Sequence, residues 1–351
     1  MTQQDTNRRR FLRSAAGLLA AAPFAGQATA QSSPPIVAEP QPVTQAAAQA
    51  STQIWPSRTI RLVVAGPPDG DMDRLAHVLS EQLSEIWSQP VTIDDQPGAG
   101  TLALDTVAQA PADGYTMLIA AGSPDVDRIL FSKQGAAAAA DLAPITLLGT
   151  FPNIIAVARS SPFQSVEELI AYARRYPGKI SWASPGVGTP PHLAGELFKR
   201  MAGLSMMHVP YNQMSDDLLH DLIGGRVNFI FDTAEALLPP LKTHEVRGLA
   251  VTSGSRYPNA PDLPTVEESG LPGYDISSWY GLYLPANTPE AIVQRLNADV
   301  VVMLRDTAMK EKVAALGIVV QTSSPKGLAD RNLAGAALWG PLIATANIKV
   351  Q

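Results

Sequence analysis

The sequence from residue 180 to residue 199 predicts a strand, a glycine-bearing loop and a helix in direct succession. Gly186 and Gly188 lack side chains, so the loop backbone can bend sharply. Thr189 followed by Pro190 is typical of a helix start. A helix start presents unpaired N–H groups and the positive end of the helix dipole, which stabilise a carboxylate or phosphate. The stretch predicts an anion-binding corner, although an ordinary βα turn explains a single corner equally well.

An earlier segment repeats this design about 120 residues before it. Residues 60–65 form the expected strand, residues 66–71 the loop, and Asp73 is the expected N-cap of a helix. The apolar residues of that helix recur with a 3.6-residue period, which indicates one face packed on a core. They are Leu75, Val78, Leu79, Leu83, Ile86 and Trp87. Two such corners predict two similar lobes, each turning a helix start toward a shared cleft.

The composition narrows the class of protein. The chain has 351 residues, of which 46% are hydrophobic and 17% charged, as expected for a soluble protein with about two domains. The net charge of −6 argues against nucleic acid or an anionic membrane surface as the main partner, because both require a clustered basic face. The absence of cysteine excludes disulfides, thiol catalysis and thiolate metal sites.

The first 54 residues predict a signal peptide for export, followed by a linker. Residues 7–13 read Asn-Arg-Arg-Arg-Phe-Leu-Arg, a twin-arginine pattern, and an alanine-rich apolar stretch leads to the A-x-A cleavage motif at residues 28–30. We expect a signal peptide over residues 1–30, cleaved after Ala30. A general secretory signal is the alternative, and either route predicts a periplasmic protein. Residues 31–54 are rich in Pro, Ala, Gln, Ser and Thr and predict a disordered linker.

The rest of the chain alternates strands with helices, which predicts an α/β protein whose parallel strands bind ligands beyond their carboxyl ends. Two long β-prone segments, residues 146–159 and 276–284, are the expected crossovers between lobes. The first lobe is therefore discontinuous, with residues 55–153 plus 277–351, and residues 154–276 form the second lobe. A buried strand over residues 227–231 delivers Asp232 at its end. We expect a monomer.

No catalytic or metal-binding motif accompanies these corners. The sequence lacks a G-x-S-x-G elbow, an H-E-x-x-H pair and a Walker loop, and Pro191 stands where a dinucleotide fingerprint would need glycine. Asp69, Asp71 and Asp73 alternate as in a calcium loop, but the glycine and glutamate that would follow are absent. We therefore expect no cofactor, no metal and no enzymatic activity.

Two further sets of polar residues leave alternatives open. His192 follows the helix start at the second corner, where it either contacts a ligand or has a capping or core role. Asp125 and Asp127 have the spacing of paired carboxylates, but no nucleophile accompanies them, and a solvated loop is the preferred interpretation.

The chain from about Trp55 to its C-terminus resembles the tripartite tricarboxylate transporter substrate-binding family, the Bug family of periplasmic solute receptors. Ten motifs, in this order along the chain, carry the resemblance. They span residues 55–61, 67–73, 96–100, 113–116, 188–196, 209–211, 231–232, 250–253, 263–266 and 278–279. The resemblance implies a two-lobed type II periplasmic-binding-protein fold, with two Rossmann-like lobes joined by two crossover strands. It also implies a cleft that closes on a small carboxylate, held by backbone amides, waters and hydroxyls.

The resemblance also assigns ligand-binding residues by position. They are Pro67, Pro68, Asp69 and Gly70 in the first loop, Ser184, Gly188, Thr189 and His192 in the second, and Ser123, Tyr211 and Asp232 along the cleft. The implied ligand is a small organic acid or amino acid, and the implied partner is a two-subunit membrane permease or a sensor kinase. An exported enzyme acting on a small carboxylate and an orphan scaffold with a degenerate cleft remain as alternatives.

The sequence departs from the family pattern in both loops. Asp69 replaces the first glycine of the family's Pro-Pro-Gly-Gly, and Asn212 and Gln213 replace a basic residue and a glycine. Both changes disfavour a plain di- or tricarboxylate and predict a ligand that is neutral or carries a cation. If Asp69 instead points to solvent, or pairs with Arg74 or Arg128, an ordinary family ligand stays possible.

Overall fold

A computed structural model describes residues 55–97, 101–122, 124–130, 142–211 and 217–348. The predicted signal peptide, linker, Ser123, Asn212 and Gln213 lie outside these residues. The strands are β1 (Ile60–Val64), β2 (Val91–Asp95), β3 (Thr116–Ala121), β4 (Leu142–Ala158), β5 (Ser181–Ser184), β6 (Met207–Pro210), β7 (Phe229–Thr233), β8 (Val246–Val251), β9 (Ser277–Pro285) and β10 (Val319–Val320). The helices are α1 (Asp71–Trp87), α2 (Thr101–Ala108), α3 (Pro124–Leu130), α4 (Val166–Arg175), α5 (Pro190–Ala202), α6 (Asp217–Ile223), α7 (Ala234–Lys242), α8 (Glu290–Arg305), α9 (Thr307–Ala315) and α10 (Pro325–Thr345).

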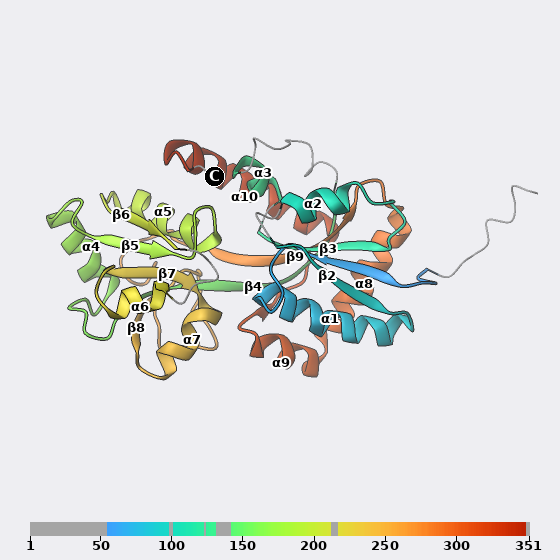
Figure 1. Cartoon of the computed structure of the whole chain (residues 1–351), viewed down its shortest axis with the longest axis horizontal. Coiled ribbons are helices and arrows are strands. Elements are labelled where there is room, and N and C mark those ends of the chain that lie inside the picture. The colour runs from blue at the N-terminus through green and yellow to red at the C-terminus, as the bar shows by residue number, and fades with distance from the viewer. Residues whose placement is uncertain (1–54, 98–100, 123, 131–141, 212–216, 349–351) are drawn as a thin grey trace, which may run out of the picture. The chain divides into compact units, whose positions relative to one another are not determined.

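The strands form two parallel groups joined by two long antiparallel strands (Figure 1). The order is β2-β1-β3-β9-β4-β7-β5-β6, with β8 and β10 also paired to β4. β1 pairs in parallel with β2 and β3, and β5 pairs in parallel with β6 and β7. β9 runs antiparallel to both β3 and β4. The predicted crossover segments at residues 146–159 and 276–284 are therefore β4 and β9.

Each strand group has apolar clusters on both of its faces, as strands covered by helices require. In the first group, α1, α8 and α9 pack on one face and α2 on the other. In the second group, α4 and α5 cover one face, and α6 and α7 the other. The end of α10 also packs into the α4 and α5 cluster through Trp339, Leu342 and Ile343. The exact lobe boundaries remain a prediction.

Local structure departs from the sequence expectations at three places. The N-cap of α1 is Gly70, and Asp73 lies inside the first turn. Helix α7 was not expected, because Pro239 and Pro240 lie within it and proline normally ends a helix. Ile86, expected on the apolar stripe of α1, is 44% exposed. Among the described residues, no helix has both the length and the apolar character needed to cross a lipid bilayer.

Candidate ligand-binding site

The first predicted loop is a tight turn that ends at the start of α1. The N–H of Gly70 donates to the carbonyl of Pro67 at 3.3 Å, and Asp69 at the third position has a φ of +62°. A turn with Pro at its second position and positive φ at its third normally carries glycine there, and aspartate is among the few side chains that tolerate it. The turn therefore accounts for the glycine of the family pattern at this position.

The side chain of Asp69 is exposed, and no pairing partner is found for its carboxylate in the described part of the chain. Its backbone N–H donates to the carboxylate of Asp73 at 2.9 Å, and its carbonyl accepts from the guanidinium of Arg74 at 3.1 Å. Arg74 thus contacts the backbone of Asp69, while Arg128 pairs with Asp125 at 3.4 Å. Of the alternatives that the sequence left open for Asp69, this position corresponds to the one in which its side chain points to solvent.

Arg74 joins the first loop to a third corner that sequence reasoning missed. Its Nη2 donates to Asp71 Oδ1 at 2.8 Å and also pairs with Glu235, which lies in the first turn of α7. Asp232, at the end of β7, accepts a 2.7 Å hydrogen bond from the N–H of Thr233. The structure therefore brings α1, β7 and α7 together around one arginine and several carboxyl groups.

The carboxyl groups at this junction hold their protons unusually strongly. Burial, together with repulsion from Asp71, raises the pKa of Glu235 to about 7 even though Arg74 opposes the shift. Burial and the charge of Asp71 likewise raise the pKa of Asp232 to about 7. Desolvation disfavours the charged form of an acid, and a nearby carboxylate adds to the effect. The junction carries more acid than Arg74 alone can neutralise.

The second predicted loop satisfies many of its own donors. The side chain of Thr189 caps the N–H of His192 at 3.4 Å and donates to the carbonyl of Gly186 at 2.8 Å. The N–H of Gly188, where φ is +85°, donates to Nδ1 of His192 at 3.0 Å. Pro190 and Pro191 have no N–H. The donors without a partner in the described structure are the N–H groups of Gly186 and Val187.

His192 has a core and capping position. It is 4% exposed, and its ring stacks on His208 with centroids 4.2 Å apart and on Trp182 at 5.8 Å. Because its Nδ1 accepts a hydrogen bond, its proton is on Nε2. Burial, with a smaller contribution from Lys199, lowers the pKa of His192 to about 4. The ring is therefore neutral at physiological pH and supports the loop from beneath.

The side chains of Ser184 and Tyr211 form hydrogen bonds within the same strand group. Ser184 is fully buried, and its hydroxyl lies 2.8 Å from Nε2 of His208. The hydroxyl of Tyr211 donates to Asp221 at 2.5 Å, and burial followed by this bond raises its pKa to about 12. Both residues border the second loop. In the described structure their polar atoms are engaged with protein groups.

Asp125 and Asp127 were expected in a solvated loop, but the structure places them on a helix. Both residues lie on α3, and Asp125 pairs with Arg128. Burial raises the pKa of Asp127 to about 8, so its carboxyl is protonated at neutral pH. The spacing of the two residues identified the pair, but only the packing of α3 against α10 and the sheet leaves Asp127 half-buried.

Comparison with known proteins places this geometry in a family. Residues 75–348 match the model described as the tripartite tricarboxylate transporter family receptor. The chain belongs to this family. A relative from Pseudomonas sp. strain P51, named for its place in the tcbD-tcbE intergenic region, is 36% identical over 82% of this chain and 86% of its own length. Protein BugT of Bordetella pertussis is 30% identical over 80% of this chain and 86% of its own length.

Two solved structures agree with the family assignment. Rpa4515 of R. palustris, solved with adipate, is 36% identical and has a TM-score of 0.73 over 84% of this chain and 99% of its own. MatC of Rhodopseudomonas palustris, solved with bound malate, is 27% identical and has a TM-score of 0.69 over 82% of this chain and 100% of its own. The predicted two-lobed type II periplasmic-binding-protein fold and the Bug resemblance are confirmed.

Proposed function

We propose that this receptor captures a small carboxylate between its two strand groups and presents it to a membrane permease or to a sensor. The family match over residues 75–348 is the observation that carries the proposal. Structural relatives solved with adipate and with malate support a small organic acid as the ligand. We further propose that the protein binds this ligand without turning it over.

We propose that the carboxylate lies on the second loop and that the other end of the ligand faces the junction of Asp71, Asp232 and Glu235. The free N–H groups of Gly186 and Val187 support the first contact, since donors without a partner bind anions well. The excess acid at the junction opposes a second ligand carboxylate. At about 5 Å and an effective dielectric near 20, repulsion by one ionised carboxylate is roughly 3 kcal/mol, and protonation of Asp232 or Glu235 relieves it at and below about pH 7. A neutral or ammonium-bearing end is therefore favoured.

Isothermal titration calorimetry with adipate, malate, citrate and a set of amino acids tests the ligand class. Native mass spectrometry of protein purified without denaturation tests which ligand is retained. We expect binding by at least one small carboxylate, and weaker binding by citrate than by an amino acid. Robust turnover of any of these compounds, lost on changing the loops, would contradict a receptor. Tight citrate binding would refute the argument from charge.

Two glycines at opposite ends of α5 provide a matched pair of variants. Gly188→Asp places a negative charge in the second loop at a position with positive φ, which aspartate tolerates. Gly203→Asp places the same charge at the other end of the helix, also at positive φ and with open space around it. We expect Gly188→Asp to weaken carboxylate binding about tenfold or more, and Gly203→Asp to leave it unchanged. Equal binding by both variants would remove the second loop from the site.

We also propose that the lobes, residues 55–153 with 277–351 and residues 154–276, close on the ligand by bending of β4 and β9. Small-angle scattering with and without saturating ligand tests this motion, and identical dimensions would contradict it. The export signal over residues 1–30 supports a periplasmic location. The mass of the mature protein from its host tests the predicted cleavage after Ala30.

A further inference from the structure

A cavity with a volume of about 690 Å³ lies beside the long strands β4 and β9 and the helix α10. This volume suits a small organic molecule. Its walls come from Thr150 on β4, Trp279 on β9, the loop after β8, and α10. None of its lining residues belongs to the loop of residues 66–70, the loop of residues 184–192, or the junction at residues 232–235. The cavity therefore shares no lining residue with the carboxylate site proposed above.

One wall of the cavity presents Arg331, which forms no direct ion pair in the described part of the chain and interacts with Asp275 only at longer range. Arg331, Gly335 and Trp339 recur every fourth residue of α10, so they lie on one helix face and line the cavity together. The guanidinium carbon of Arg331 lies 4.5 Å from the ring centroid of Trp279. Its Nε is buried without a hydrogen-bond partner, and no ion pair reaches it within the described residues. A partly desolvated guanidinium with free donors is a strong site for a carboxylate.

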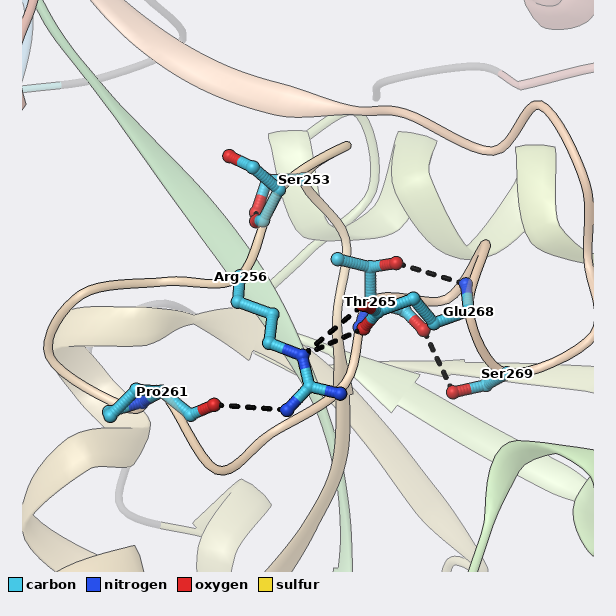
Figure 2. Close-up of polar contacts among 7 residues, drawn as sticks. Ser253, Arg256, Pro261, Thr265, Glu268 and Ser269 are labelled. Atoms are coloured by element: carbon cyan, nitrogen blue, oxygen red, sulfur yellow. Dashed lines mark hydrogen bonds and ion pairs between the residues drawn. The ribbon is translucent and has the colours of Figure 1, made fainter.

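The loop after β8, which supplies Ser253, Gly254 and Ser255 to the cavity wall, is held in place by hydrogen bonds, some of which Figure 2 shows. Ser253 donates to the carbonyl of Ser255 at 2.8 Å, and Arg256 pairs with Glu268 at 3.0 Å. Glu268 and Thr265 in turn bond each other's backbone N–H groups at 2.8 and 3.0 Å. The loop at the cavity wall is therefore fixed before a ligand binds, which reduces the conformational entropy lost on binding.

Two acidic side chains on the cavity wall restrict the charge of its ligand. Asp275 accepts the N–H of Gly254 at 2.7 Å, and Glu267 accepts the N–H of Gly273 at 3.1 Å. Each carboxyl group is thus held at the cavity wall by a backbone donor. They would repel a second carboxylate of a bound ligand, whereas Arg331 attracts the first. The wall has one guanidinium for two carboxyl groups, so it offers a partner to one ligand carboxylate and none to a second.

We infer that this cavity is a second binding site, specific for a small monocarboxylate with an apolar body. The carboxylate contacts the free guanidinium edge of Arg331. The apolar body lies against Trp339 and Leu338, and Leu338 is a large apolar side chain that is 43% exposed at the wall. Benzoate has this chemistry and serves as the probe.

Fluorine NMR of protein labelled with 5-fluorotryptophan tests the site directly. The chain has five tryptophans, so each gives one signal that a Trp→Phe variant assigns. Trp279 and Trp339 line the cavity, whereas Trp182 lies under the second loop. Benzoate up to about 20 mM should shift the signals of Trp279 and Trp339 saturably and leave that of Trp182 in place. Adipate should not reproduce these shifts.

Variants of α10 decide whether the shifts report this cavity. Arg331→Met should weaken benzoate about tenfold or more, because it removes the only cation on the cavity wall among the described residues. Leu338→Asp adds an anion at the wall and should weaken benzoate similarly, whereas Leu333→Asp, on the same helix but outside the cavity, should not. Absence of any shift, a shift of Trp182 alone, or unchanged affinity in both Arg331→Met and Leu338→Asp would overturn the proposal.

Discussion

Replacement of Gly195 on α5 by alanine should destabilise the protein, because Gly195 lies against the indole that supports the second loop. A Cβ at this position would lie 2.1 Å from Cζ3 of Trp182, 2.3 Å from Cη2 and 2.8 Å from Cε3. Trp182 is fully buried and contacts His192, His208 and Phe231, so its ring has no room to retreat. Overpacking of this kind costs about 1–3 kcal/mol. The clash should fall at the upper end of that range.

Helix propensity acts in the opposite direction, since alanine is favoured over glycine by about 1 kcal/mol inside a helix. The net prediction for Gly195→Ala is a loss of about 2 kcal/mol in the free energy of unfolding. In a protein of this size or somewhat smaller, each kcal/mol lowers the melting temperature by about 2–4 °C, so the melting temperature should fall by about 5 °C. Thermal and urea unfolding, each followed by circular dichroism, measure both quantities.

A double-mutant cycle identifies the cause of the loss. Trp182→Phe removes the outer part of the indole, so in that background Gly195→Ala should become neutral or stabilising. The coupling energy between the two sites should then be about 2 kcal/mol or more. If Gly195→Ala raises the stability of the wild-type background, or costs the same in both backgrounds, the clash with Trp182 does not govern this position and the reasoning fails.

Three further predictions concern the loops. Asp69→Ala should lower the free energy of unfolding by about 1 kcal/mol while Asp69→Gly does not, because φ is +62° there, and urea unfolding distinguishes them. The pKa of Glu235 is raised to about 7, so its contribution to the free energy of unfolding is complete below about pH 4.5 and is lost as the pH rises through 7. Glu235→Gln should make this loss smaller by about 1–2 kcal/mol, after allowance for solvent screening, when unfolding is measured from pH 4 to 8. His192 has a pKa lowered to about 4, so its neutral ring is fully favourable above about pH 6.5; stability should fall by about 2–3 kcal/mol toward pH 4, and His192→Asn should show a smaller fall.

Much of the local structure was predictable because its interactions span only a few residues. The caps of α4, α5 and α10 by Ser165, Thr189 and Ser324 are each a side-chain contact with an N–H three residues later. The apolar period of α1 and the glycines of the second loop are similarly local. These features indicated two strand–loop–helix corners, and the family resemblance supplied the arrangement around them.

Only the tertiary structure decided how the polar residues of the corners act. Arg74 meets Glu235 across 161 residues, and the bond places α7 in the candidate site although two prolines had hidden that helix. His192 supports the loop because Trp182 and His208 stack around it, and Asp127 keeps its proton because α3 packs against α10. Burial and charge pairing depend on neighbours brought together by the fold. The sequence by itself determined the two corners and the cap of the second one, Thr189, whereas burial by segments distant in the chain determined the protonation of their polar residues.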